Sequence, residues 1–159
     1  MKILYLNPGA DMGGAETSLT DLLAGLRQAQ PQWQLHLLTG ADGPLLDLAR
    51  QSGVSTEIVD LPGGLASAGD SALAGGGSSR WRALARLGPA AWETHHYGMR
   101  LRKAAERFQP DLIHATGLKM QILSALYLAS VAPVLWHIHD YVGWRPLARR
   151  LLAILAGRC

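Results

Sequence analysis

Short apolar runs alternate with helical patterns along the whole chain, and this alternation restricts the possible folds more than any other feature. Five runs are short enough to be strands: residues 2–7, 33–39, 54–60, 111–116 and 133–139. Between them, apolar residues recur at helical spacing, as at Leu19, Leu22, Leu23 and Leu26. Nearly continuous apolar strands joined through helices predict a parallel sheet that is covered on both faces.

We therefore expect a single Rossmann-like α/β domain over residues 1–159, built as a three-layer sandwich. Apolar residues make up 48% of the chain, which is enough for a core of this size. The sheet should contain about five parallel strands in the order 3-2-1-4-5, with right-handed crossovers. This order places a switch point between the first and fourth strands, where ligands bind beyond the carboxyl ends.

Two stretches interrupt the regular alternation. Residues 62–79 are rich in Gly, Ser and Ala, and we predict a flexible loop because they bury too little apolar area to offset their ordering entropy. Residues 80–108 read as helical with a break at Gly88-Pro89, and the last helix should start near Pro146 and reach Ala156. Residues 120–136 carry no charge, but their polar residues and Pro133 favour a buried helix and strand over a membrane span.

Paired glycines follow the first strand, at Gly13 and Gly14, and open the first helix. Glycines at a helix start allow close approach of a ligand, and the free amides favour an anion. A tight strand-to-helix turn explains the same pair equally well. The spacing excludes other phosphate loops, because the chain has neither G-x-G-x-x-G after the first strand nor G-x-x-x-x-G-K-[ST].

Histidines gather near the ends of the fourth and fifth strands. His137 and His139 alternate with Ile138, so they point to one face, and His114 lies near the end of the fourth strand. With Asp140 they resemble a zinc ligand set, but the spacing is not that of metallo-hydrolases. We expect no metal, a packed or hydrogen-bonded His137, and a His139 that meets a substrate.

Charge is divided unevenly between the two halves of the chain. Residues 1–79 have 3 basic and 8 acidic groups, whereas residues 80–159 have 12 and 4. The basic half indicates either solvated helix faces or a phosphate-bearing or anionic membrane partner. Arg and Trp in residues 80–92, and Arg and Leu in the last helix, fit a helix at a lipid surface as well as one packed on the sheet.

Nucleic acid is not an expected partner, because the aromatic residues have no stacking arrangement and no recognised motif is present. Cys159 is the single cysteine, so no disulfide forms within the chain. With no signal-peptide pattern at the N-terminus, a cytoplasmic location is expected, with peripheral attachment to the inner face of the membrane as a further expectation.

Three stretches resemble the N-terminal domain of the retaining family 4 glycosyltransferases, which have the GT-B fold. They are "ILYLNPGADMGGAETSLTDLLAGL", "QPDLIHATGLKMQILSALYLA" and "APVLWHIHDYVGWRPLARRLLAILA", in the family's order. The resemblance implies one half of a GT-B fold that faces a second domain across a cleft. In such enzymes the N-terminal domain mainly binds the acceptor, and the C-terminal domain holds the nucleotide-sugar.

The resemblance also implies roles for particular residues. Gly13 and Gly14 would contact the donor diphosphate, and His139 would be the catalytic residue that reaches the donor sugar. Thr116, Gly117 and Lys119 would line the acceptor side, where Lys119 would neutralise an acceptor phosphate. The implied reaction moves a sugar to the hydroxyl of a sugar or lipid-linked acceptor and keeps the anomeric configuration. No cofactor is implied, since the nucleotide-sugar is a co-substrate.

The donor-binding half of the family is absent from the 159 residues, including its two glutamates eight residues apart. The expected partner is therefore a donor-binding domain or a second subunit, and the chain alone is expected to be incomplete as an enzyme. An alternative interpretation is a non-catalytic subunit that recruits a catalytic chain to its acceptor or to a membrane.

Overall fold

A computed structural model describes the backbone of residues 1–67, 80–139 and 146–159, and the side chains of residues 1–66, 91–139 and 148–159. Five strands form one parallel sheet in the order β3-β2-β1-β4-β5, which confirms the predicted order. Their bounds are Lys2–Asn7 for β1, Gln34–Thr39 for β2, Ser55–Ile58 for β3, Leu112–Thr116 for β4 and Val134–His137 for β5.

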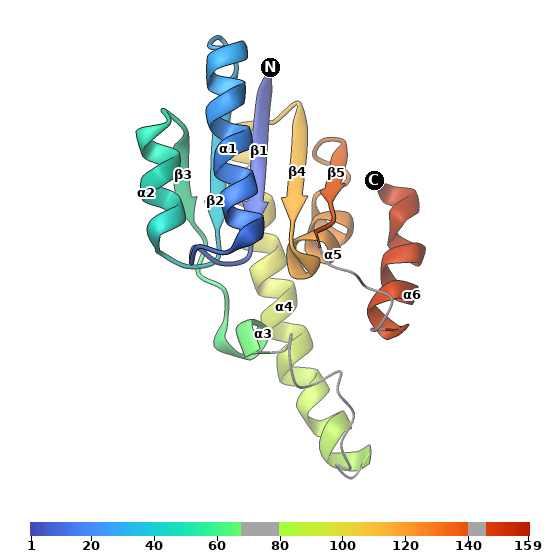
Figure 1. The fold of residues 1–159 in the computed structure, drawn as a ribbon. Coiled ribbons are helices and arrows are strands. Elements are labelled where there is room, and N and C mark those ends of the chain that lie inside the picture. Colours follow the sequence, from blue (N-terminus) through green and yellow to red (C-terminus); the bar gives the residue numbers. More distant parts are fainter. Residues whose placement is uncertain (68–79, 140–145) are drawn as a thin grey trace.

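Helices cover the sheet on both faces, as Figure 1 shows. The helices are α1 (Gly14–Ala29), α2 (Pro44–Gln51), α3 (Gly63–Ser67), α4 (Arg80–Phe108), α5 (Leu118–Tyr127) and α6 (Pro146–Leu155), with a final 3₁₀ turn at Ala156–Arg158. Because successive strand residues point to opposite faces, β1 sends Ile3 and Tyr5 to one side and Leu4 and Leu6 to the other.

Each face of β1 belongs to a separate core. One core joins Ile3 and Tyr5 to Leu19 and Leu23 of α1 and to residues of β2 and α2. The other joins Leu4 and Leu6 to residues of α4, α5, β4 and β5. These two layers of helices on one sheet confirm the Rossmann-like α/β sandwich.

Two local predictions differ from the structure. Residues 63–67 form the short helix α3 inside the segment predicted as a loop, because the amides of Leu65 and Ala66 bond to Pro62 O. Residues 68–79 lie outside the described residues. α4 runs without the predicted break at residues 88–89, so the loss of one backbone hydrogen bond at Pro89 does not end the helix.

Candidate functional site

The carboxyl ends of all five strands meet at one edge of the sheet, and a pocket opens there. Its volume is about 520 Å³, and it lies among the loops that follow β1, β2 and β3 and the first turn of α5. Eleven residues line it: Pro8, Gly9, Asp11, Met12, Gly13, Glu16, Gly40, Ala41, Leu61, Ala66 and Lys119. We call this the edge pocket.

Gly13 and Gly14 stand at the open N-terminus of α1. Both are exposed, and Gly13 is the N-cap with an extended backbone. The carbonyl of Gly13 accepts bonds from the amide and the hydroxyl of Thr17, both at 2.9 Å. The first amides of α1 lack partners within the helix, and together with the helix dipole they favour an anion. Gly13 lines the edge pocket, whereas Gly14 is not among its lining residues.

Glu16 places a carboxylate beside Gly13. A Cβ atom built on Gly13 would lie 2.9 Å from Glu16 Oε2, so a side chain at residue 13 would make the carboxylate shift. The other oxygen, Oε1, accepts a 3.1 Å bond from Asn7 Nδ2. The edge pocket therefore has two acidic groups, Asp11 and Glu16, facing one basic group, Lys119.

Thr116 and Gly117 lie behind the edge pocket rather than on its wall. Thr116 is 1% exposed, and its hydroxyl oxygen lies 2.9 Å from Leu6 O and 2.6 Å from Asn7 Oδ1, so its one proton is shared between these two acceptors. Gly117 has a φ of 72°, and a Cβ atom there would lie 3.0 Å from Pro8 Cγ. A side chain at residue 117 would meet both backbone strain and a close contact, so the loop requires glycine.

Lys119 follows in the first turn of α5 and reaches across the edge pocket. Its Nζ donates to Ala66 O, which ties α5 to the short helix α3. Lys119 and Gly13 thus share the pocket, although 106 residues separate them in sequence. The structure brings these two predicted site residues together and leaves the other four outside the pocket lining.

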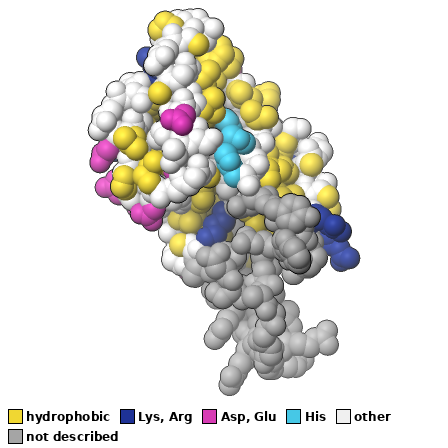
Figure 2. All heavy atoms as spheres, viewed as in Figure 1, with side chains coloured by type: hydrophobic (Ala, Val, Ile, Leu, Met, Phe, Trp, Pro, Cys, Tyr) yellow, Lys and Arg dark blue, Asp and Glu magenta, His cyan; other side chains and the backbone are white. Residues whose placement is uncertain are grey.

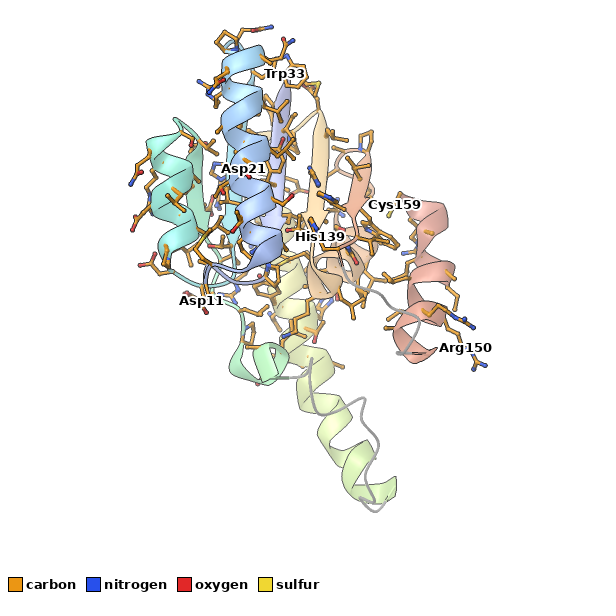
Figure 3. All side chains as sticks on the ribbon, viewed as in Figure 1. Asp11, Asp21, Trp33, His139, Arg150 and Cys159 are labelled. Atoms are coloured by element: carbon orange, nitrogen blue, oxygen red, sulfur yellow. The ribbon has the colours of Figure 1, made fainter. Side chains whose placement is uncertain are left out.

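Three histidines form a row on the side of the sheet that α1 covers. The ring centroids are 5.3 Å apart for His114 and His137 and 3.9 Å apart for His137 and His139, and Tyr5 continues the row at 5.1 Å from His114. Figure 2 shows histidine side chains gathered on the face beside α1. In Figure 3, Asp11 and His139 both lie toward the edge where the strands end.

The row runs from a buried ring to an exposed one. His114 is 6% exposed, and its Nε2 has no hydrogen-bond partner in the described part of the chain, whereas His139 is exposed. Burial, followed by the charges of His137 and His139, lowers the pKa of His114 to about 4. Burial and the nearby His139 lower the pKa of His137 as well. At neutral pH, His114 and His137 are therefore uncharged.

The histidine row is not arranged as a metal site. Within residues 1–66, 91–139 and 148–159, no group of three or more His, Cys, Asp or Glu is placed to hold a metal ion. Asp140, which follows His139 in the quoted motif, lies outside the described residues.

Asn7 and Glu16 are the site residues that sequence reasoning did not single out as partners. The sequence shows Asn7 only as the end of an apolar run before Pro8-Gly9, and Glu16 only as an acidic residue in a first helical turn. Their pairing depends on the path of the loop between them. The position of Asn7 at the carboxyl end of the central strand was the one available signal.

No helix in the described part of the chain is both long enough and apolar enough to cross a membrane. Basic and apolar residues do reach the surface together on α6. Leu151 is 39% exposed and Ile154 is 76% exposed, and the exposed Arg150 precedes Ile154 by four residues. The other predicted lipid-facing stretch, residues 80–92, has side chains that are described only at its last two positions.

Comparison with known proteins identifies relatives by sequence and by fold. The sequence model of the family described as Glycosyltransferase Family 4 matches residues 12–159. No curated protein matches the chain. Several solved glycosyltransferase structures, each with less than 25% identity, are similar to it in fold.

Anabaena Alr3699/HepE, solved in complex with UDP and glucose, has 23% identity and a TM-score of 0.62 over 99% of this chain. The lipopolysaccharide outer core galactosyltransferase WaaB has 10% identity and a TM-score of 0.60 over 96%. The calicheamicin glycosyltransferase CalG4 has 14% identity and a TM-score of 0.51 over 99%. The chain spans 36%, 37% and 42% of the lengths of these three solved chains, respectively.

Proposed function

Since this chain belongs to glycosyltransferase family 4, we propose that it is the acceptor-side half of an enzyme that moves a sugar from a nucleotide-sugar to an acceptor hydroxyl. The proposed reaction keeps the anomeric configuration. The observation that supports it most is the strand-end edge, where the open start of α1, the edge pocket and the exposed His139 are all accessible. In folds of this type, ligands bind at that edge.

The donor diphosphate is proposed to bind at Gly13 and Gly14. Their exposure leaves the first-turn amides of α1 open to an incoming anion. These amides would stabilise the charge that develops on the leaving diphosphate, a role that needs no metal or covalent step from this half. HepE, a relative by fold, was solved with UDP and glucose, which is the kind of ligand proposed for this chain.

His139 is proposed to contact the donor sugar. It is the exposed end of the histidine row, and its ring lies 3.9 Å from that of His137 at a tilt of 39°, a contact that restricts rotation of the ring. A restricted imidazole presents its nitrogen atoms in a defined direction, which suits a hydrogen bond to a sugar hydroxyl. Replacement of His139 by Ala should therefore lower kcat more than it raises the acceptor KM.

The acceptor is proposed to occupy the edge pocket. Lys119 would pair with an acceptor phosphate if the acceptor is lipid-linked, and Asp11 would accept hydrogen bonds from sugar hydroxyls. Thr116 and Gly117 would serve the acceptor side by holding Asn7 and Pro8 in place, because the Thr116 hydroxyl is buried. Their proposed contribution is thus indirect, through the two residues that they hold.

A donor-binding half is the proposed partner, either as a further domain or as a second subunit. The chain spans 36–42% of the length of the similar solved glycosyltransferases, so a large part of those proteins has no counterpart in it. The test is reconstitution: the 159-residue chain is assayed for nucleotide release from nucleotide-sugars, alone and with the polypeptide encoded next to it. Transfer only in the mixture supports the proposal, and no transfer in either contradicts it.

A second candidate is a non-catalytic subunit that brings a catalytic chain to a membrane, and α6 favours it. Ile154 and Leu151 are exposed on the same helix as Arg149 and Arg150, which suits the inner, anionic face of the cytoplasmic membrane. Co-sedimentation with anionic liposomes at low salt tests the attachment. If the co-purified partner transfers sugar equally well without this chain, the chain is a non-catalytic subunit rather than half of the enzyme.

A further inference from the structure

Asn7, the last residue of β1, connects three elements that meet at the switch point. Its Nδ2 donates to Gly9 O at 2.9 Å and to Glu16 Oε1 at 3.1 Å. Its Oδ1 accepts the Thr116 hydroxyl at 2.6 Å. Asn7 is 2% exposed; its bond from Thr116 is buried, whereas its bonds to Gly9 and Glu16 are part-buried. One buried amide thus joins the end of β1 to the loop before α1, to α1 itself and to the end of β4.

We propose that Asn7 is a positioning residue for the transfer reaction, which fixes the loop between β1 and α1 and holds the Glu16 carboxylate in the edge pocket. This inference rests on the proposed function. These hydrogen bonds require a side chain that both donates and accepts on one short planar group. Among side chains of this length, only the asparagine amide does both. A carboxylate of the same shape cannot donate to Gly9 O or to Glu16.

The position of Glu16 shows what Asn7 controls. A glutamate at the third helical position commonly reaches back to the amide of its N-cap residue. Here the only hydrogen bond to the Glu16 carboxylate within the described residues comes from Asn7. Asn7 therefore fixes where this negative group lies in the edge pocket, next to Gly13 at the start of α1.

The rest of the loop is held by packing that leaves little freedom around Asn7. Ala10 O accepts the amide of Leu45 at 3.0 Å, and a Cβ atom on Gly43 would lie 2.7 Å from the same oxygen. A Cβ atom on Gly40 would overlap Pro8 O. The loop is thus packed at Pro8 and Ala10, and Asn7 determines its path at Gly9 and the direction of Glu16.

The test replaces Asn7 with aspartate, which keeps the shape and removes both donated bonds. Two carboxylates then face each other, and the amides of residues 9–16 should exchange hydrogen at least about tenfold faster. The double variant Asn7→Asp/Glu16→Gln supplies a new donor, because the glutamine amide can donate to the new carboxylate. It should restore slow exchange. Glu16→Gln alone is the matched control, since its carbonyl oxygen still accepts the bond from Asn7.

Should Asn7→Asp fail to fold, Thr116→Val serves as the milder variant. It removes the hydroxyl bond to Asn7 and keeps the side-chain shape, whereas Thr116→Ser keeps the bond. Faster exchange of residues 9–16 in the valine variant, but not in the serine variant, supports the inference. Equal acceleration of every amide in the sheet, or no acceleration, overturns it, because Asn7 would then be a packing residue only.

The reaction is measured with the chain joined to its donor-binding half. Asn7→Asp should raise the KM of the nucleotide-sugar about tenfold with kcat nearly unchanged, and Glu16→Gln in the same chain should recover most of the loss. An unchanged KM overturns the role in transfer. If exchange behaves as expected but the natural sequence transfers no sugar, the proposed function fails while the hold of Asn7 on the loop is supported.

Discussion

Replacing His114 with phenylalanine should make the fold less sensitive to acid. His114 is 6% exposed, and its Nε2 lacks a hydrogen-bond partner in the described part of the chain. Its pKa is lowered from 6.5 to about 4, mainly by burial. The folded state therefore binds fewer protons than the unfolded state, and the stability contributed by the neutral ring is complete above pH 6.5 and is lost as the pH falls toward 4.

The size of the effect follows from the pKa difference. One pKa unit corresponds to about 1.4 kcal/mol, so the full difference is about 3 kcal/mol, of which about 2 kcal/mol is lost at pH 5. For a chain of this length, about 2 kcal/mol shifts the melting temperature by roughly 4–8 °C. The assay is thermal unfolding at pH 7.5 and pH 5 for the natural sequence and for His114→Phe.

The variant should melt at least as high as the natural sequence at pH 7.5, because phenylalanine removes an unpartnered polar atom. Between pH 7.5 and pH 5, its melting temperature should fall by roughly 4–8 °C less than that of the natural sequence. His96→Phe is the control, since His96 is exposed on α4 and should not reduce the acid sensitivity. An equal fall in melting temperature for the natural sequence and for His114→Phe would show that the buried ring does not cause the acid sensitivity.

Three glycine-to-alanine exchanges test the packing by thermal unfolding. Gly98→Ala should destabilise by about 1–3 kcal/mol, because the new Cβ atom would lie 2.5 Å from ring atoms of Tyr127. Gly40→Ala should destabilise by a similar amount, since its Cβ atom would overlap Pro8 O and lie 2.9 Å from Leu61 Cβ. Gly25→Ala should instead stabilise by up to about 1 kcal/mol, because it is exposed in α1 with nothing within 4 Å. Gly40 or Gly98 variants as stable as Gly25→Ala would contradict this account.

The fold was largely predictable because the strand pattern, together with the rules for connecting parallel strands, allows few strand orders. Apolar runs separated by helical patterns indicate parallel pairing, and right-handed crossovers then leave few strand orders, of which 3-2-1-4-5 is confirmed. Short-range deviations were not predictable. α3 forms because Pro62 O accepts two amides and Leu65 packs against the core beside α4, which depends on tertiary contacts rather than on composition.

The candidate site was predictable only in part. Strand alternation correctly placed His137 and His139 on one face, and the centroids of their rings lie 3.9 Å apart. Strand alternation gave no indication that the Thr116 hydroxyl would bond to Leu6 O of β1. This bond depends on which strand lies beside β4. The edge pocket also takes Leu61 and Ala66 from a stretch with no motif. Side-chain partners across loops depend on loop paths, which composition does not determine.

The most direct test of the account is a nuclear magnetic resonance titration of the chain together with its donor-binding half. Nucleotide-sugar is added, and shifts are followed at the amides of Gly13 and Gly14 and at the imidazole of His139. We expect these signals to move together with one binding constant, and signals around Glu57 of β3 and Arg107 of α4, which line a separate pocket, to stay in place. Shifts confined to that separate pocket, with Gly13, Gly14 and His139 unchanged, would contradict the proposed site.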